Sequence, residues 1–108
     1  MIKIEELRIG NWVEHNGEII QVKPYHFEVF MNPESQPAYA IPLTEEILLK
    51  CGTSLGLGWY DFKPFEYNFT SGELWVFGSD VAITHIKHLH ELQNLYYSLC
   101  DEELNIEL

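Results

Sequence analysis

Basic residues are scarce in this chain of 108 residues. Six lysine and arginine residues face 17 aspartate and glutamate residues, which gives a formal net charge of −11 at pH 7. No two of the bases are adjacent, and binding to nucleic-acid phosphates needs clustered basic side chains. Direct nucleic-acid binding is therefore disfavoured. The acidity favours either simple solubility or an acidic surface that engages a basic partner, for instance by imitating nucleic acid.

Cysteine and long apolar runs are also scarce. The two cysteines, Cys51 and Cys100, fall at the ends of two predicted helices and are expected to be buried and reduced. No apolar run approaches the roughly 18 residues of a membrane span, and the first residues do not have the form of a signal peptide. A single domain over residues 1–108 is expected, because its length is that of one domain and 46% hydrophobic residues suffice for a core. A cytoplasmic location is expected, and no cofactor is predicted.

The pattern of strands and turns predicts an α+β fold. Asn16-Gly17 is typical of a type I′ turn between two strands, at residues 11–15 and 18–23. Short strands and turns predict a curled antiparallel sheet or a small β-barrel. The further strands are expected at residues 25–31, 38–41, 59–63, 67–70, 73–77, 81–83 and 104–108, with a flexible connector over residues 52–58.

Two helices are expected, over residues 44–51 and 84–100. Thr44 is suited to cap the first, and Gly52 to end it. In the second helix the apolar residues cover so wide an arc that one flat surface cannot bury them. This helix is therefore expected to be wrapped by a curved sheet or shared between a sheet and a partner chain. Gln93 falls inside the arc, so its amide must be hydrogen-bonded or must face a pocket.

Aromatic residues and a few polar side chains are the candidates for binding. Alternation places Trp75 and Phe77 on one strand face, with Leu74 and Val76 on the other. Such two-sided apolarity indicates that the second face meets a further sheet layer, a partner subunit or a flat ligand, and a homo-oligomer is expected. The residues proposed to contact a ligand or partner are Arg8, Asn11, Trp12, Trp59, Gln93 and Asn94.

Catalytic and metal-binding patterns are weak. His85 and His88 would lie one turn apart on a helix and could chelate a metal, but no third ligand stands at metal spacing. Both project into the apolar arc, which favours histidines at the edge of a core. Neither cysteine has a local motif that would activate it as a nucleophile. No catalytic residue is predicted.

Four strings of the sequence occur in an order and spacing that suggest a family. They are LRIGNWV at residues 7–13, IPLTEEILLKCG at residues 41–52, HELQNLY at residues 90–96 and EEL at residues 102–104. In these the chain resembles a family of small uncharacterised proteins of Bacteroidetes bacteria and of their phages and mobile elements. The resemblance spans nearly the whole chain and matches residues 53–80 only loosely. The chain departs from it at Cys100-Asp101, where a Thr-Gly pair is expected.

Three functional hypotheses follow. The first is a non-enzymatic interaction protein that binds a host protein, such as a defence protein, which the provenance implied by the resemblance suggests by analogy. The second is a small-molecule binder, such as a sponge for a nucleotide signal, in which Arg8, Asn11, Gln93 and Asn94 would orient a base or sugar. The third is a metal-dependent hydrolase that uses His85 and His88.

Overall fold

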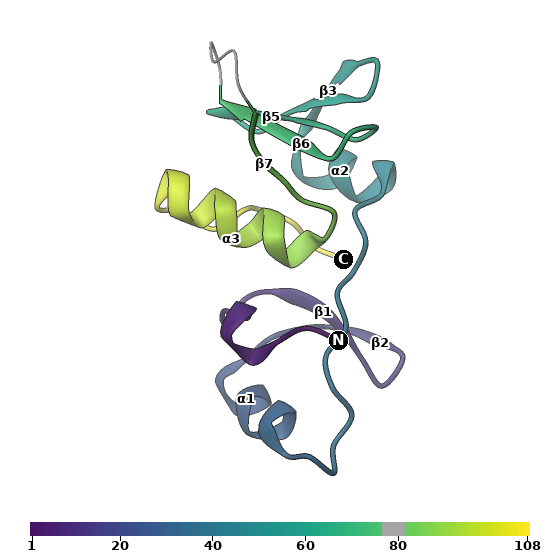
Figure 1. Cartoon of the computed structure of the whole chain (residues 1–108), viewed down its shortest axis with the longest axis vertical. Helices are drawn as coiled ribbons and strands as arrows, with labels where there is room; N and C mark the ends of the chain where they lie inside the picture. The colour runs from purple at the N-terminus through teal and green to yellow at the C-terminus, as the bar shows by residue number, and fades with distance from the viewer. Residues whose placement is uncertain (77–81) are drawn as a thin grey trace.

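In the computed structural model, which describes residues 1–76 and 82–108, helix α3 (Leu89–Cys100) lies between a β-hairpin near the N-terminus and a five-stranded sheet (Figure 1). We call residues 1–40 the hairpin unit and residues 41–108 the sheet unit. Each has its own cluster of buried apolar residues. The molecule is elongated, with extents of 46 × 24 × 21 Å. The expected α+β class is confirmed.

The hairpin unit is built on the turn that the sequence predicts. Strands β1 (Trp12–His15) and β2 (Glu18–Gln21) pair antiparallel. The turn residues Asn16 and Gly17 have φ angles of 53° and 77°, as a type I′ turn requires at both central positions. A 3₁₀ helix, η1 (Ile4–Glu6), precedes β1. Of the expected strand at residues 38–41, one bridge forms, from Tyr39 to Glu14 of β1.

The expected strand over residues 25–31 is wrong, because this segment is helix α1 (Pro24–Met31). Proline at the first helical position already has the φ that a helix needs. The Lys23 amide donates a hydrogen bond to His26 Nδ1 at 2.9 Å, which fixes the start of the helix. Phe27 and Phe30, three residues apart, both pack on the hairpin core. The apolar residues of this segment therefore fit the spacing of a helix as well as the alternation of a strand.

The sheet unit begins with helix α2 (Glu45–Cys51), where the sequence predicts it. Thr44 Oγ1 accepts a hydrogen bond from the Ile47 amide at 3.2 Å, as an N-cap should. A five-stranded antiparallel meander follows in the order β3-β4-β5-β6-β7. Its strands are β3 (Thr53–Gly56), β4 (Trp59–Asp61), β5 (Phe65–Asn68), β6 (Glu73–Val76) and β7 (Ala82–His85).

The structure corrects one expectation about this sheet and decides between two alternatives. The supposed connector at residues 52–58 contains β3, which pairs with β4 through a turn whose residues Gly56, Leu57 and Gly58 all have positive φ. Of the two expected forms, a curled antiparallel sheet or a small barrel, the structure has an open antiparallel sheet, with β3 and β7 at its two edges. Strands of three or four residues give it little length over which to curl. Phe77 and Val81, expected in strands, lie outside the described residues.

Helix α3 starts five residues later than the sequence suggests. Residues 84 and 85 belong to β7, and the helix begins at Leu89. The expected terminal strand over residues 104–108 has no strand partner, although Leu104 and Ile106 are buried in the core of the sheet unit. A buried alternating pattern was thus mistaken for a hydrogen-bonded strand.

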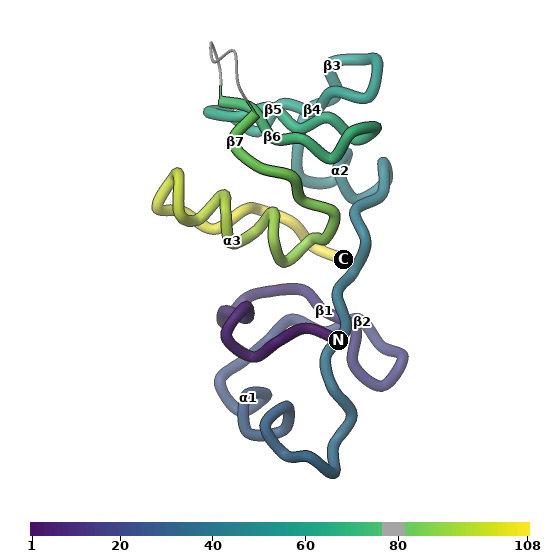
Figure 2. The backbone as a smooth tube through the Cα atoms, in the orientation of Figure 1, coloured from purple at the N-terminus to yellow at the C-terminus, as the bar shows by residue number. Residues whose placement is uncertain are grey.

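The wide apolar arc of α3 is covered in a way that differs from both expectations. Leu89 and Leu92 are fully buried in the core of the sheet unit, while Gln93 and Asn94 meet the hairpin unit. The C-terminus lies near the middle of the molecule, beside α3, and the N-terminus lies with the β1–β2 hairpin (Figure 2). The five-stranded sheet and the hairpin unit of the same chain therefore cover α3 from two sides. Within the described residues, every helix is too short or too polar to cross a bilayer.

Candidate functional site

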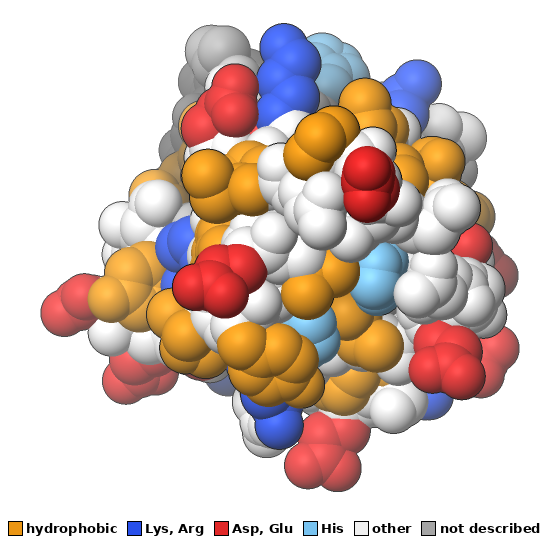
Figure 3. Space-filling model, turned by 90° about the horizontal axis from the view of Figure 1, so that it is seen from below, with side chains coloured by type: hydrophobic (Ala, Val, Ile, Leu, Met, Phe, Trp, Pro, Cys, Tyr) orange, Lys and Arg blue, Asp and Glu red, His pale blue; other side chains and the backbone are white. Residues whose placement is uncertain are grey.

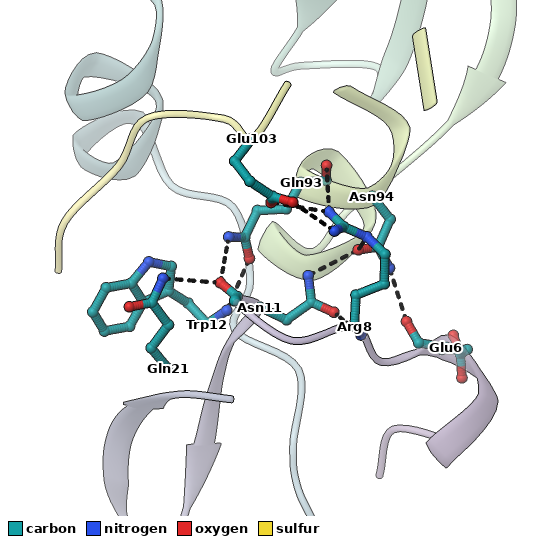
Figure 4. A network of polar contacts seen from close by, with 9 residues as sticks. Glu6, Arg8, Asn11, Trp12, Gln21, Gln93, Asn94 and Glu103 are labelled. Carbon is teal, nitrogen blue, oxygen red and sulfur yellow. Dashed lines mark hydrogen bonds and ion pairs between the residues drawn. The ribbon is translucent and has the colours of Figure 1, made fainter. Parts of the chain in front are cut away.

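Five of the six residues proposed for binding come together where the hairpin unit meets α3 (Figure 4). Arg8, Asn11 and Trp12 lie at the start of β1, and Gln93 and Asn94 lie on α3. Trp59, the sixth, lies elsewhere, on strand β4. We call this group of five residues, together with Glu6 and Glu103, the polar junction.

The Gln93 side chain hydrogen-bonds to the backbone on both sides of the point where β1 begins. Its side-chain oxygen Oε1 accepts a hydrogen bond from the Trp12 amide at 2.8 Å, and its Nε2 donates to the Gly10 carbonyl at 3.0 Å. The side chain is buried, so both bonds lie away from water. This confirms that the amide inside the apolar arc is hydrogen-bonded and does not project into an empty pocket.

Asn11 and Asn94 form a second pair across the junction. Asn11 is fully buried; its Oδ1 accepts from the Arg8 amide at 2.7 Å and its Nδ2 donates to Asn94 Oδ1 at 2.8 Å. Asn94 Nδ2 donates in turn to the Glu6 carbonyl at 2.8 Å. Each of the two amides therefore uses both its donor group and its acceptor atom.

Arg8 closes the solvent side of the junction. Its guanidinium donates to both carboxylate oxygens of Glu103, at 2.7 and 3.2 Å, and its Nε donates to Asn94 Oδ1 at 3.0 Å. The group also lies 4.3 Å from the centre of the Tyr97 ring, within the range of a cation–π contact. Such a two-pronged pairing orients the arginine more firmly than a single exposed ion pair would.

The polar junction can do little as a ligand site, because its members satisfy one another. The groups expected to orient a base or sugar already bond to the protein itself. A connected polar network of this kind, buried at Asn11 and Gln93 and open to solvent at Arg8 and Glu103, specifies how two elements meet. The sequence missed Glu6 and Glu103 as members, and its only signal for Glu103 was the acidic run at residues 101–103.

A groove beside the junction has a volume of about 420 Å³. It is lined by Trp12, Gln21 and the chain at residues 103–108. Trp12 Nε1 donates to the Ile106 carbonyl at 3.2 Å, so the indole holds the C-terminal segment in place. The polar end of this tryptophan is thus engaged within the chain.

The two candidate metal ligands do not share a helix. His85 belongs to β7 and is largely exposed, with its Nε2 3.9 Å from a Glu73 oxygen. His88 precedes α3, and its Nδ1 lies 2.8 Å from Glu91 Oε1. The one-turn spacing that suggested chelation is therefore wrong. Among residues 1–76 and 82–108, no group of three histidine, cysteine, aspartate or glutamate side chains is placed to hold a metal ion.

Both cysteines are free, as predicted, and both are half-buried. The Cys51 thiol donates to the Ile47 carbonyl at 3.3 Å, and burial raises its pKa to about 12. At neutral pH the thiol therefore stays protonated, whereas the nucleophile in cysteine chemistry is the thiolate.

His90 is the one buried histidine among the described residues, with 3% of its surface exposed. Neither ring nitrogen has a hydrogen-bond partner within the described part of the chain, and the nearest carboxylate oxygen, on Glu6, lies 3.7 Å from Nε2. Desolvation lowers the pKa of His90 below its ordinary value of 6.5, against a smaller opposing effect of Glu91 and Glu6. The ring is therefore neutral at pH 7.

A His90→Phe variant should have a flatter dependence of stability on pH than the natural chain. The unfolded histidine binds a proton near pH 6.5 and folded His90 does so only at lower pH, so the unfolded state holds more protons in between. The contribution of neutral His90 to the free energy of unfolding is fully present above pH 6.5 and is lost as the pH falls below that value. Urea unfolding at pH 8.0, 6.5 and 5.5 checks this, with the pH 8.0 values serving as the reference. If the free energy of unfolding changes equally with pH in the variant and in the natural chain, His90 does not have a lowered pKa in the folded protein.

These features define an α+β protein in which α3 joins a hairpin unit to an open five-stranded sheet through a buried polar junction. Comparison with models of known protein families, with curated proteins and with solved structures finds no match to this chain. The function is accordingly argued from its surfaces.

Proposed function

We propose that this chain is a non-catalytic binding protein that engages another protein through helix α1. The observation that carries the proposal is that α1 is largely apolar and yet none of its eight residues is buried. Monomeric proteins seldom leave large apolar surfaces without a use. The partner we propose is a host protein, in line with the resemblance to proteins of bacteria and their phages.

One side of α1 packs on the hairpin core, and the other side faces solvent. Phe27 and Phe30 turn inward and pack on the hairpin core. Tyr25 and Met31 turn outward, and 62% and 67% of their surfaces are exposed. Because these two side chains add little to the core, the fold does not explain their apolar character.

The end of the molecule that carries α1 has the composition of a contact surface. Viewed from below, hydrophobic side chains gather there, with acidic side chains around and between them (Figure 3). Aromatic residues and methionine are enriched at protein interfaces, and a polar rim around an apolar centre is usual. Polar residues that could act on a small molecule are instead occupied in the polar junction, which favours binding over chemistry.

A different protein suits this surface better than a second copy of the chain. Each copy has a formal net charge of −11, so two copies repel one another at low ionic strength. The expected homo-oligomer stays a prediction, and light scattering on a sizing column tests it. A dimer that Tyr25→Ser with Met31→Ser converts to monomer would make a second copy the occupant of α1.

Site-specific cross-linking tests the proposed surface. A photoreactive phenylalanine at position 25 should give a discrete cross-linked product in host lysate, and the same group at position 49 should not. Leu49 is the matched control, since 59% of its surface is exposed and it lies on α2. Unlabelled natural protein should compete the product away at least tenfold better than the double variant Tyr25→Ser with Met31→Ser.

Three results would contradict the proposal: the same products from both positions, no product from either, or equal competition by the double variant. A second control variant, Leu49→Ser with Leu55→Ser, removes a similar exposed apolar area from the sheet unit. It should compete as the natural protein does. Both double variants should unfold within a few degrees of the natural chain, because exposed substitutions usually change stability by about 0.5 kcal/mol or less.

A further inference from the structure

The outer face of the five-stranded sheet carries two tryptophans and three carboxylates in adjacent rows. In one row Asp61 lies opposite Glu66, which lies opposite Trp75 on the next strand. In the neighbouring row Trp59 lies opposite Asn68, and Glu73 lies opposite His85. Directly opposed side chains in a sheet lie about 5 Å apart at Cβ, so each carboxylate lies close to its neighbours in these rows.

This face is not part of either core. The alternate residues Tyr60, Tyr67 and Leu74 are buried and point to the opposite side. Helices α2 and α3 both lie on that opposite side of the sheet (Figure 1). Trp59 and Trp75 belong to neither core cluster and are only partly buried. No described helix covers this face, although the Nε1 atom of Trp75 is itself buried.

Within these two rows the carboxylates are the only side chains with a fixed charge. Asp61, Glu66 and Glu73 contribute three carboxylates, and the two rows contain no lysine or arginine. The chain around them has a formal net charge of −11. A second copy of this chain, a nucleotide or any other polyanion is repelled from such a face. A cationic group is attracted to both of its components, the carboxylates and the electron-rich faces of the indoles.

We propose that the outer face of the sheet binds an arginine-rich segment of a partner protein. The planar guanidinium stacks on an indole and at the same time donates paired hydrogen bonds to a carboxylate, which a lysine ammonium cannot do. Two strand spacings and one side-chain repeat place the two indoles roughly 12 Å apart, which three to four residues of an extended chain span. Arginines at positions four apart in an extended segment reach both tryptophans. This surface lies apart from α1, so the inference stands or falls separately from the proposed function.

The three tryptophans provide a built-in control for a direct test. The probe is a flexible peptide of about nine glycine and serine residues, with two arginines spaced four apart. Titration is followed by the indole N–H signals in a nitrogen-15 correlation spectrum at low salt. The signals of Trp59 and Trp75 should shift. The Trp12 signal should stay, because its indole lies at the polar junction and donates to the Ile106 carbonyl.

Two double variants with the same change in charge distinguish binding at this face from general attraction of the peptide to an acidic protein. Glu66→Gln with Glu73→Gln should weaken arginine-peptide binding about tenfold. Glu18→Gln with Glu107→Gln removes the same charge at exposed positions elsewhere and should weaken it less than twofold. A lysine peptide of the same design should bind at least threefold more weakly than the arginine peptide.

Four results would overturn the proposal. In the titration, these are a shift of the Trp12 signal equal to those of Trp59 and Trp75, or shifts of Trp59 and Trp75 only with neutral oligosaccharides. In the affinity measurements, they are equal weakening by the two charge-matched double variants, or equal affinity for the arginine and lysine peptides. Unfolding curves for both double variants confirm that the charge change, and not loss of the fold, is what the titration reports.

Discussion

Gln93→Leu should lower the free energy of unfolding by about 3 kcal/mol. The substitution keeps the approximate size of the side chain but leaves the buried Trp12 amide without an acceptor and removes one of two donors to the Gly10 carbonyl. A buried backbone group that loses its partner costs about 1–3 kcal/mol, and the branched side chain adds a packing penalty against the hairpin. Chemical denaturation at pH 7.5 measures the loss.

The control for Gln93→Leu is Ser98→Ala, an exposed change on the same helix that should alter stability by about 0.5 kcal/mol or less. Hydrogen exchange supplies a second readout. The Trp12 amide should lose protection by a larger factor than amides of the five-stranded sheet, because the lost bond joins the hairpin to α3. Equal stability of Gln93→Leu and the natural chain would show that the junction contributes nothing net to the fold.

Leu92→Ala should be at least as damaging, with a loss of about 3–4 kcal/mol. Leu92 is fully buried on α3 in the core of the sheet unit, and truncation of such a leucine to alanine costs about 2–5 kcal/mol. Leu99→Ala is the matched control on the same helix. Since 43% of the Leu99 surface is exposed, its truncation should cost about 1 kcal/mol or less.

The Leu92→Ala variant also tests whether the two units unfold together. The hairpin core has only five buried apolar residues, Ile2, Leu7, Val13, Val22 and Ala38. So small a core should not remain folded once α3 leaves it. One transition, with loss of hydrogen-exchange protection at both Val13 and Leu74, is the expected result. Two separate transitions would show that the hairpin unit is independently stable.

Sequence reasoning succeeded where local chemistry decides the structure. The Asn16-Gly17 turn and the Thr44 cap each depend on a few neighbouring residues, and both formed as predicted. The hydrogen-bonding of Gln93 followed from its place in an apolar arc, whatever its partner. Five of the six residues proposed to contact a ligand or partner were also found together, where they bond to one another across the polar junction.

The failures arose where two patterns overlap or where a distant partner decides. The segment at residues 25–31 alternates as a strand does and also spaces Phe27 and Phe30 as a helix does, and Pro24 favoured the helix. The choice between a curled sheet and a barrel stayed open for a similar reason, because it depends on strand length and on what covers each face, and short apolar runs encode neither. The pairing of Arg8 with Glu103 joins residues 95 positions apart, so no local pattern could reveal it.

The polar junction also determines the order in which the chain can complete its structure during synthesis. The hairpin emerges from the ribosome first, but the Trp12 amide must wait for Gln93, which lies 81 residues later. Arg8 waits longer still, for Glu103. Until then the hairpin lacks its partners, and contacts so distant in sequence close late because of the entropy of the intervening loop. Completion of the hairpin unit is therefore coupled to synthesis of the chain as far as Glu103.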